Sequence, residues 1–193
     1  MGLIELLLLS VGLAMDAFAV SICKGLSAGK VSFKNASCCG MWFGLFQGLM
    51  PLIGYLLGSA FAGIIDRFSG WVAFIILAII GGNMVKEGFS GAEEESADFS
   101  IKAMFPLAVA TSIDALAVGI TFVAIPVDVL AASALINTVF AVSVIAVITF
   151  AISAAGTYIG GVFGTQYRKP AIISGGIILI LIGLKSIIQS LIK

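Results

Sequence analysis

Two aspartates inside apolar segments are the residues of this sequence best suited to chemistry. Asp16 and Asp114 each lie in a stretch that carries no other charge for several residues on either side. A lone carboxylate at the centre of a bilayer costs about 3 kcal/mol on insertion scales, so acids in such segments usually serve a function. Two carboxylates that share a site repel each other unless a cation lies between them. We therefore expect a divalent-cation site; the alternative is a protonated Asp bonded to a backbone carbonyl.

Two amide side chains are expected at a comparable depth and complete the predicted metal site. These are Gln47 and Asn83, so the predicted ligands are Asp16, Asp114, Gln47 and Asn83. A set made only of oxygen atoms suits Mg, Ca or Mn, whereas zinc and copper favour imidazole and thiolate. The alternative role of the two amides is to hold helices together by hydrogen bonds. Lys185 stands at the repeat position of Asn83, which would place it near the site. The alternative is that its side chain extends toward the membrane surface.

Other polar groups and motifs are better explained without a role in metal or nucleotide binding. Cys23, Cys38 and Cys39 lack the spacing of a common metal or redox pair, so we expect small buried hydrophobes. The stretch 25–30 resembles a phosphate-binding loop but is one residue short and is followed by Val31, so we expect no nucleotide. The acidic run 93–95 is expected in a solvated cytoplasmic loop, and the alternative is a role in raising the local concentration of cations at an entrance.

Composition places these residues in a membrane. Of the 193 residues, 61% are hydrophobic and only 10% are charged, and mean hydropathy is +1.21. A soluble domain of this size could not bury so much apolar surface. Basic and acidic residues balance at ten each, which excludes a basic surface for nucleic acid. We expect a single membrane domain over 1–193, with the lipid bilayer as its solvent.

Six apolar segments are long enough, or nearly so, to cross a bilayer as helices. The expected spans are 3–23, 37–60, 71–85, 103–125, 130–153 (with a longer helix as the alternative) and 171–191. Pro51 lies inside the second span, so we expect a kink or local unwinding there. Pro106 is expected in the first turn of the fourth span, where a missing N–H costs little. The fold class is therefore all-α, with six transmembrane helices.

The two halves of the chain resemble each other. Segment 10–22 aligns with 108–120 at six identical positions out of thirteen, and the aspartates coincide. Later, Gly54 and Gly58 match Gly156 and Gly160. Each repeat holds three spans, so the second must enter the membrane inverted, as in many secondary transporters. We expect repeat one over 1–90, an acidic loop over 86–102 and repeat two over 103–193.

Basic residues sort by loop and predict the orientation. Lys24, Lys30 and Lys34 fall in the first loop, whereas the even loops carry only Arg67. Because cytoplasmic loops are enriched in Lys and Arg, we expect the odd loops in the cytoplasm and both termini outside.

Four ordered motifs resemble one known family. They are MDAFAVSICKG (15–25), FQGLMPLIGY (46–55), GGNMVKEGF (81–89) and ATSIDALAVGI (110–120), and together they resemble the manganese efflux pump (MntP) family. The resemblance implies a bacterial inner-membrane protein that exports Mn²⁺ as its substrate, without a cofactor. The family's paired acids carry over onto Asp16 and Asp114, and its glycine onto Gly25. Some members have Glu at the position of Gln47 and Arg at that of Asn83, so this chain has fewer charges in the site.

Other functions stay open at this point. The first alternative is an exporter of another divalent cation or of small solutes such as amino acids. An intramembrane aspartyl protease also uses two aspartates but needs Gly-x-Gly before one of them, and neither Asp16 nor Asp114 follows such glycines. We therefore expect a transporter and no enzyme, with a homo-oligomer as a further possibility.

Overall fold

The computed structural model describes residues 1–58, 98–124, 126–130 and 132–166, with scattered helical residues between 71 and 89 and between 173 and 188. Four complete helices are described, each long and apolar enough to cross a membrane. They are α1 (Leu3–Ala28), α2 (Phe33–Leu57), α4 (Ile101–Ala124) and α5 (Ala134–Gln166). The prediction of an all-helical membrane protein is confirmed at this level.

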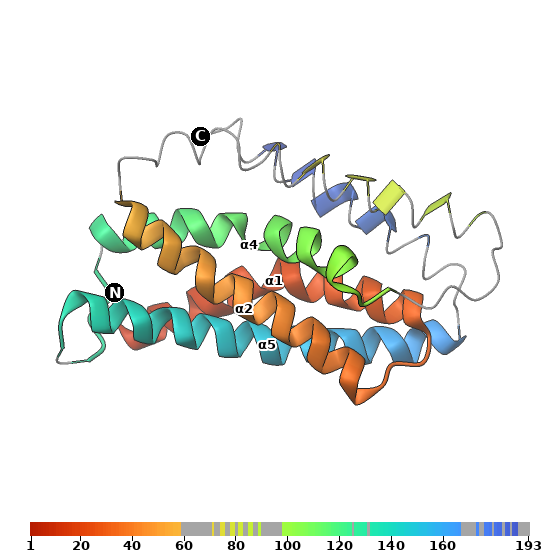
Figure 1. Ribbon diagram of the computed structural model, residues 1–193, viewed down its shortest axis with the longest axis horizontal. Helices are drawn as coiled ribbons and strands as arrows, with labels where there is room; N and C mark the ends of the chain where they lie inside the picture. The colour runs from red at the N-terminus through yellow and green to blue at the C-terminus, as the bar shows by residue number, and fades with distance from the viewer. Residues whose placement is uncertain are drawn as a thin grey trace.

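The helices form an elongated bundle in which α1 and α5 run one way and α2 and α4 the other (Figure 1). Backbone contacts fix the two ends of the bundle. The Met1 ammonium donates to the Pro126 carbonyl oxygen at 2.9 Å, so α1 begins beside the α4–α5 loop. At the other end, Lys24 Nζ donates to the Asp98 carbonyl oxygen at 2.9 Å, so α1 finishes beside the chain that enters α4.

Glycines allow α2 and α5 to pack closely. Gly40, Gly44 and Gly48 recur at every fourth position of α2 and face α5. A Cβ at Gly44 would lie 2.7 Å from the Ala146 carbonyl oxygen, which is closer than side chains tolerate. Small residues at this spacing are the usual means by which transmembrane helices bring their backbones together.

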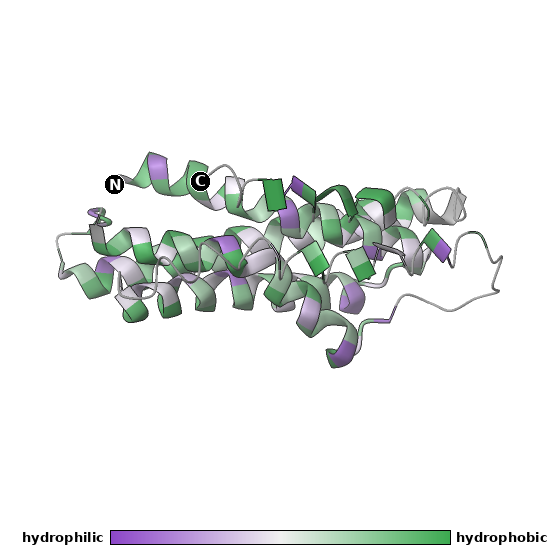
Figure 2. Ribbon diagram, turned by 90° about the horizontal axis from the view of Figure 1, so that it is seen from above, coloured by the Kyte–Doolittle hydropathy of each residue, from purple (hydrophilic) through white to green (hydrophobic). Residues whose placement is uncertain are grey.

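Apolar residues predominate along the length of the helices (Figure 2), and many of them face outward. Leu8 on α1, Leu56 on α2 and Val147 on α5 are among the large hydrophobic side chains that stay exposed. An exposed apolar surface of this extent would be unfavourable in water but is satisfied by lipid acyl chains.

Two helix ends differ from the prediction because of local caps. α1 continues past Cys23 to Ala28 and stops at Gly29, which has a φ of +67°. A left-handed φ of this kind favours glycine. α2 begins at Phe33 rather than Ser37, because the Ser32 side chain accepts a hydrogen bond from the Asn35 N–H and caps the helix.

α5 extends well beyond the predicted 130–153. Its 33 residues run from Ala134 to Gln166. The start is delayed because Asn137 folds the preceding loop: its Oδ1 accepts from the Leu130 N–H at 2.7 Å and its Nδ2 donates to the Leu130 carbonyl oxygen at 3.0 Å. Asn137 therefore has a structural role at the end of the bundle.

The prolines behave differently from the prediction. Pro51 lies within α2, and the helix continues past it to Leu57, so local unwinding, one of the two alternatives predicted at Pro51, is wrong, whereas the kink stays a prediction. Gly119 of α4 packs directly on the Pro51 backbone, and this contact supports the helix where a hydrogen bond is missing. Pro106 lies in the interior of α4, which begins at Ile101, and not in its first turn.

Parts of the prediction lie outside the described residues. The acidic run 93–95 and Arg67 are among them, and the expected spans 71–85 and 171–191 are described only at scattered helical positions.

Candidate cation site

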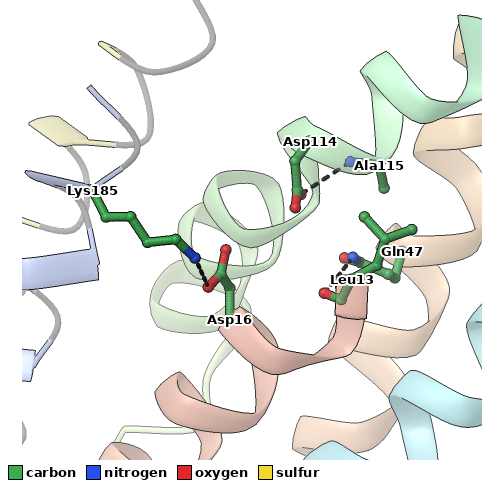
Figure 3. Close-up of polar contacts among 6 residues, drawn as sticks. All are labelled: Leu13, Asp16, Gln47, Asp114, Ala115 and Lys185. Atoms are coloured by element: carbon green, nitrogen blue, oxygen red, sulfur yellow. Dashed lines mark hydrogen bonds and ion pairs between the residues drawn. The ribbon is translucent and has the colours of Figure 1, made fainter. Parts of the chain in front are cut away.

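Asp16 and Asp114 approach each other from two oppositely directed helices, α1 and α4, and the two carboxylates face one region (Figure 3). They are close enough for the charge of Asp16 to act on Asp114. The Asp16 side chain is 31% exposed, and Asp114 is also exposed. The structure thus brings together the two acids that the sequence singled out and leaves both accessible.

Small residues surround the acids on their own helices. Ala17 follows Asp16 and Ala115 follows Asp114, and both alanines are fully buried. The Ala115 N–H donates to Asp114 Oδ1 at 3.0 Å, which holds one carboxylate oxygen against its own helix. Each carboxylate therefore extends from a helix that is closely packed at the adjacent residue.

Gln47 lies on α2 beside the turn of α1 that precedes Asp16. Its side chain is fully buried, and Nε2 donates to the Leu13 carbonyl oxygen at 2.9 Å (Figure 3). Its Oε1 has no hydrogen-bond partner within the described part of the chain. A buried carbonyl oxygen without a partner costs free energy, so Gln47 is suited to accept a further donor or a cation.

Asn83, the fourth predicted ligand, lies outside the described residues. Lys185, which occupies its repeat position, is described. The Lys185 Nζ lies 3.7 Å from Asp16 Oδ1 (Figure 3). The sequence pointed to Lys185 only through the repeat, because a lysine near the end of an apolar run usually extends to the membrane surface.

The hydroxyl groups near the acids bond to their own helices. Thr111 Oγ1 donates to the Leu107 carbonyl oxygen at 3.0 Å, and Ser112 Oγ donates to the Ala108 carbonyl oxygen at 2.7 Å. Their donor hydrogens are thereby used, but each oxygen keeps a lone pair that could accept.

A buried polar face on α5 was missed by the sequence analysis. Thr149, Ser153 and Thr157 recur at every fourth position and are fully buried. The hydroxyls of Thr149, Ser153 and of Ser21 on α1 have no hydrogen-bond partner among the described residues. The four-residue spacing was visible in the sequence, but hydroxyls in an apolar helix usually bond to the preceding turn and so predict little.

The cysteines stand apart from this site. None of the three forms a disulfide, and Cys23 and Cys39 are buried, as expected for small hydrophobes. Over the described ranges, no group of three or more His, Cys, Asp or Glu side chains could hold a metal. Two carboxylates and neutral oxygens are the donors that hard divalent cations favour.

Outside the bundle, Asp98 organises the start of α4. The Ser100 N–H and hydroxyl donate to its two carboxylate oxygens at 2.7 and 2.8 Å. These hydrogen bonds favour the charged form and lower the pKa of the Asp98 carboxyl.

Comparisons with known proteins find relatives over nearly the whole length of this chain. A family model described as "Putative manganese efflux pump" matches residues 30–187. A protein named "Putative manganese efflux pump MntP" from Desulfitobacterium hafniense (strain Y51) is 50% identical over 191 residues, which cover 99% of this chain and 97% of the relative. Relatives with the same name from Acetivibrio thermocellus and Bifidobacterium adolescentis are 47% and 46% identical; they cover 99% and 98% of this chain and 93% and 97% of their own lengths. No solved structure matches.

Proposed function

Because this chain belongs to the MntP family of manganese efflux pumps and is a multi-pass bacterial membrane protein, we propose that it exports Mn²⁺ from the cytoplasm. The observation that carries the proposal is the aspartate pair of Asp16 and Asp114, which arrive from oppositely directed helices. The repeated occurrence of a mid-span acid is costly, and the gain from binding a divalent ion offsets that cost.

The chemistry of the donors favours a hard divalent cation. Two carboxylates neutralise the charge of Mn²⁺, and the free Oε1 of Gln47 offers a further oxygen one helix away. Amino acids, the alternative substrates, carry a carboxylate that the two acids would repel. Another divalent cation is the stronger alternative, because oxygen ligands alone discriminate weakly among such ions.

We further propose that the fold is a pair of inverted repeats, and matched contacts support this. The alignment that equates Asp16 with Asp114 also equates Phe18 with Leu116 and, later, Gly54 with Gly156. A methyl group on Gly54 would collide with the Leu116 carbonyl oxygen, and one on Gly156 would lie 3.0 Å from the Phe18 carbonyl oxygen. The α2–α4 contact therefore has a counterpart between α5 and α1, as inverted repeats require.

Inverted repeats suit a secondary transporter that opens its site to each side in turn. The two halves can exchange conformations about a site at their interface, so one pair of acids serves both directions. The acids lie where α1 of the first half faces α4 of the second.

The distribution of charge supports an orientation with the α1–α2 loop in the cytoplasm. One end of the described bundle carries the basic residues Lys24, Lys30, Lys34 and Lys102. The opposite end, beside the Met1 ammonium, carries Glu5 and Asp128. The positive-inside rule then places the lysine-bearing end in the cytoplasm.

The test is the metal content of cells with and without the protein under loading with Mn²⁺, Fe²⁺, Zn²⁺ and Cd²⁺ separately. We expect the protein to lower intracellular manganese, with smaller changes for the other metals. A drop in another metal alone would assign that metal as the substrate, and unchanged content of all four would contradict the proposal.

A further inference from the structure

We propose that Lys185 is a tethered counter-cation, which occupies the aspartate pair when the metal is absent and competes with Mn²⁺ for it. This inference rests on the proposed export function. The Lys185 Nζ lies 3.7 Å from Asp16 Oδ1, and its charge also acts on Asp114. Figure 3 shows the ammonium of Lys185 reaching across to Asp16, and Lys185 is one of the described helical residues near the end of the chain.

The charge balance makes the lysine and the metal mutually exclusive. When both carboxylates are ionised, Asp16, Asp114 and Lys185 together carry a net charge of −1 (two carboxylates and one ammonium). Adding Mn²⁺ while the ammonium stays would raise this to +1, whereas adding Mn²⁺ as the ammonium leaves gives zero. An excess charge inside the membrane is costly, so binding of the metal and withdrawal of Lys185 are coupled.

The geometry of Lys185 permits this withdrawal. Its side chain is 59% exposed, so it can leave without disturbing a packed core. The separation of 3.7 Å is longer than the 2.7–2.9 Å of a tight charge-assisted hydrogen bond. A lysine ammonium is strongly hydrated and sits on a flexible four-carbon stem, so it exchanges more easily than an arginine fork. Lys185 therefore has the properties of a weak competitor of Mn²⁺ for Asp16 and not of a permanent ion-pair partner.

A built-in competitor serves an exporter, because export requires the release of a divalent ion from two carboxylates. When the ammonium returns to Asp16, it neutralises part of the negative charge that held the metal. Affinity for Mn²⁺ is lowered, and release is faster. The alternative is a purely structural ion pair between Lys185 and Asp16, which would leave the affinity for Mn²⁺ unchanged when Lys185 is neutralised.

The experiment measures Mn²⁺ binding to the purified full chain at one fixed neutral pH, with Lys185→Met, Lys185→Gln and Lys185→Arg. We expect both neutral variants to bind Mn²⁺ about tenfold more tightly and to export it with a lower maximal rate and a lower KM. Lys185→Arg, which keeps the charge, should stay closer to the wild type. Lys30→Met is the matched control: it removes a lysine from the α1–α2 loop and should leave the affinity unchanged.

Coupling to Asp16 separates competition from a general effect of charge or folding. In an Asp16→Asn background, Lys185→Met should change the Mn²⁺ affinity much less than it does alone, because the contact is already lost. Unchanged or weaker binding by both neutral variants, with thermal unfolding like the wild type, would overturn the inference. If the wild type binds a different divalent ion, the manganese proposal fails and the same comparison with that ion decides the role of Lys185. If it binds none, both proposals are wrong.

Discussion

Gln47 Nε2 donates a hydrogen bond to the Leu13 carbonyl oxygen at 2.9 Å, which ties the middle of α2 to the turn of α1 that precedes Asp16. The same side chain keeps Oε1 without a partner among the described residues, although it is fully buried. One amide thus ties α2 to the helix that carries Asp16 and keeps a buried oxygen that is suited to accept a donor or a cation. These two roles lead to the first prediction.

Replacement of Gln47 by Leu should weaken Mn²⁺ binding about tenfold, because it removes both the tie to Leu13 and the free oxygen. Binding to the purified protein measures this directly. Thr138→Val is the matched control: Thr138 is buried on α5, and its hydroxyl bonds only to the Ala134 carbonyl oxygen of its own helix. Equal affinities for Gln47→Leu and the wild type would remove Gln47 from the site.

Gly119→Ala should separate α2 from α4. We expect a lower melting temperature and a severalfold lower export rate. A Cβ at Gly119 would collide with the Pro51 backbone, which cannot move aside as a flexible side chain could. Gly12→Ala is the control, since a Cβ at Gly12 has no neighbour within 4 Å. Melting in detergent and export at matched protein levels are the measurements. A Gly119→Ala protein as stable as Gly12→Ala would show that α2 and α4 are not held this closely.

The sequence predicted the class of the fold because membrane helices are specified by long apolar runs, which can be read without tertiary information. It predicted helix ends poorly where single residues decide them. Gly29 ends α1 by its positive φ, and the Ser32 cap starts α2. Pro51 was misjudged because the packing of Gly119 outweighs the local cost of the proline.

The candidate site was predicted in part for the same physical reasons. Asp16 and Asp114 stood out because placing a charge in an apolar run costs free energy, and because both acids occupy the same position in the two halves of the sequence. The ion pair between Lys185 and Asp16 joins residues far apart in the chain, so neither spacing nor hydropathy could predict it. The buried hydroxyls of α5 were missed because serine and threonine carry little information in an apolar helix.

Labelling of single cysteines should place the two ends of the bundle on opposite sides of the membrane. In a background without Cys23, Cys38 and Cys39, a cysteine at Lys30 should react with an impermeant reagent only after the cells are opened. A cysteine at Ser133, in the loop between α4 and α5, should react in intact cells. Both substituted positions are exposed, so a lack of reaction reflects sidedness. The reverse pattern would invert the proposed orientation.

Asp16→Asn and Asp114→Asn should each abolish Mn²⁺ export while leaving the protein in the membrane. Asn keeps the shape and hydrogen bonding of Asp but removes the charge that holds a divalent ion. Because losing a charge inside the membrane also removes an insertion cost, both variants should fold at least as well as the wild type. Intracellular manganese at matched membrane levels of each variant is the measurement.

The double variant distinguishes a shared site from two separate ones. If Asp16 and Asp114 hold one ion together, either substitution already eliminates export, and Asp16→Asn with Asp114→Asn should be no worse than each alone. Two independent sites would instead leave partial export in each single variant and less in the double. Asp128→Asn is the matched control, because Asp128 is an exposed acid in the α4–α5 loop. This variant should export Mn²⁺ normally. Near-normal export by either site variant, with the Asp128 control also normal, would end the paired-carboxylate mechanism, whatever the family of the chain.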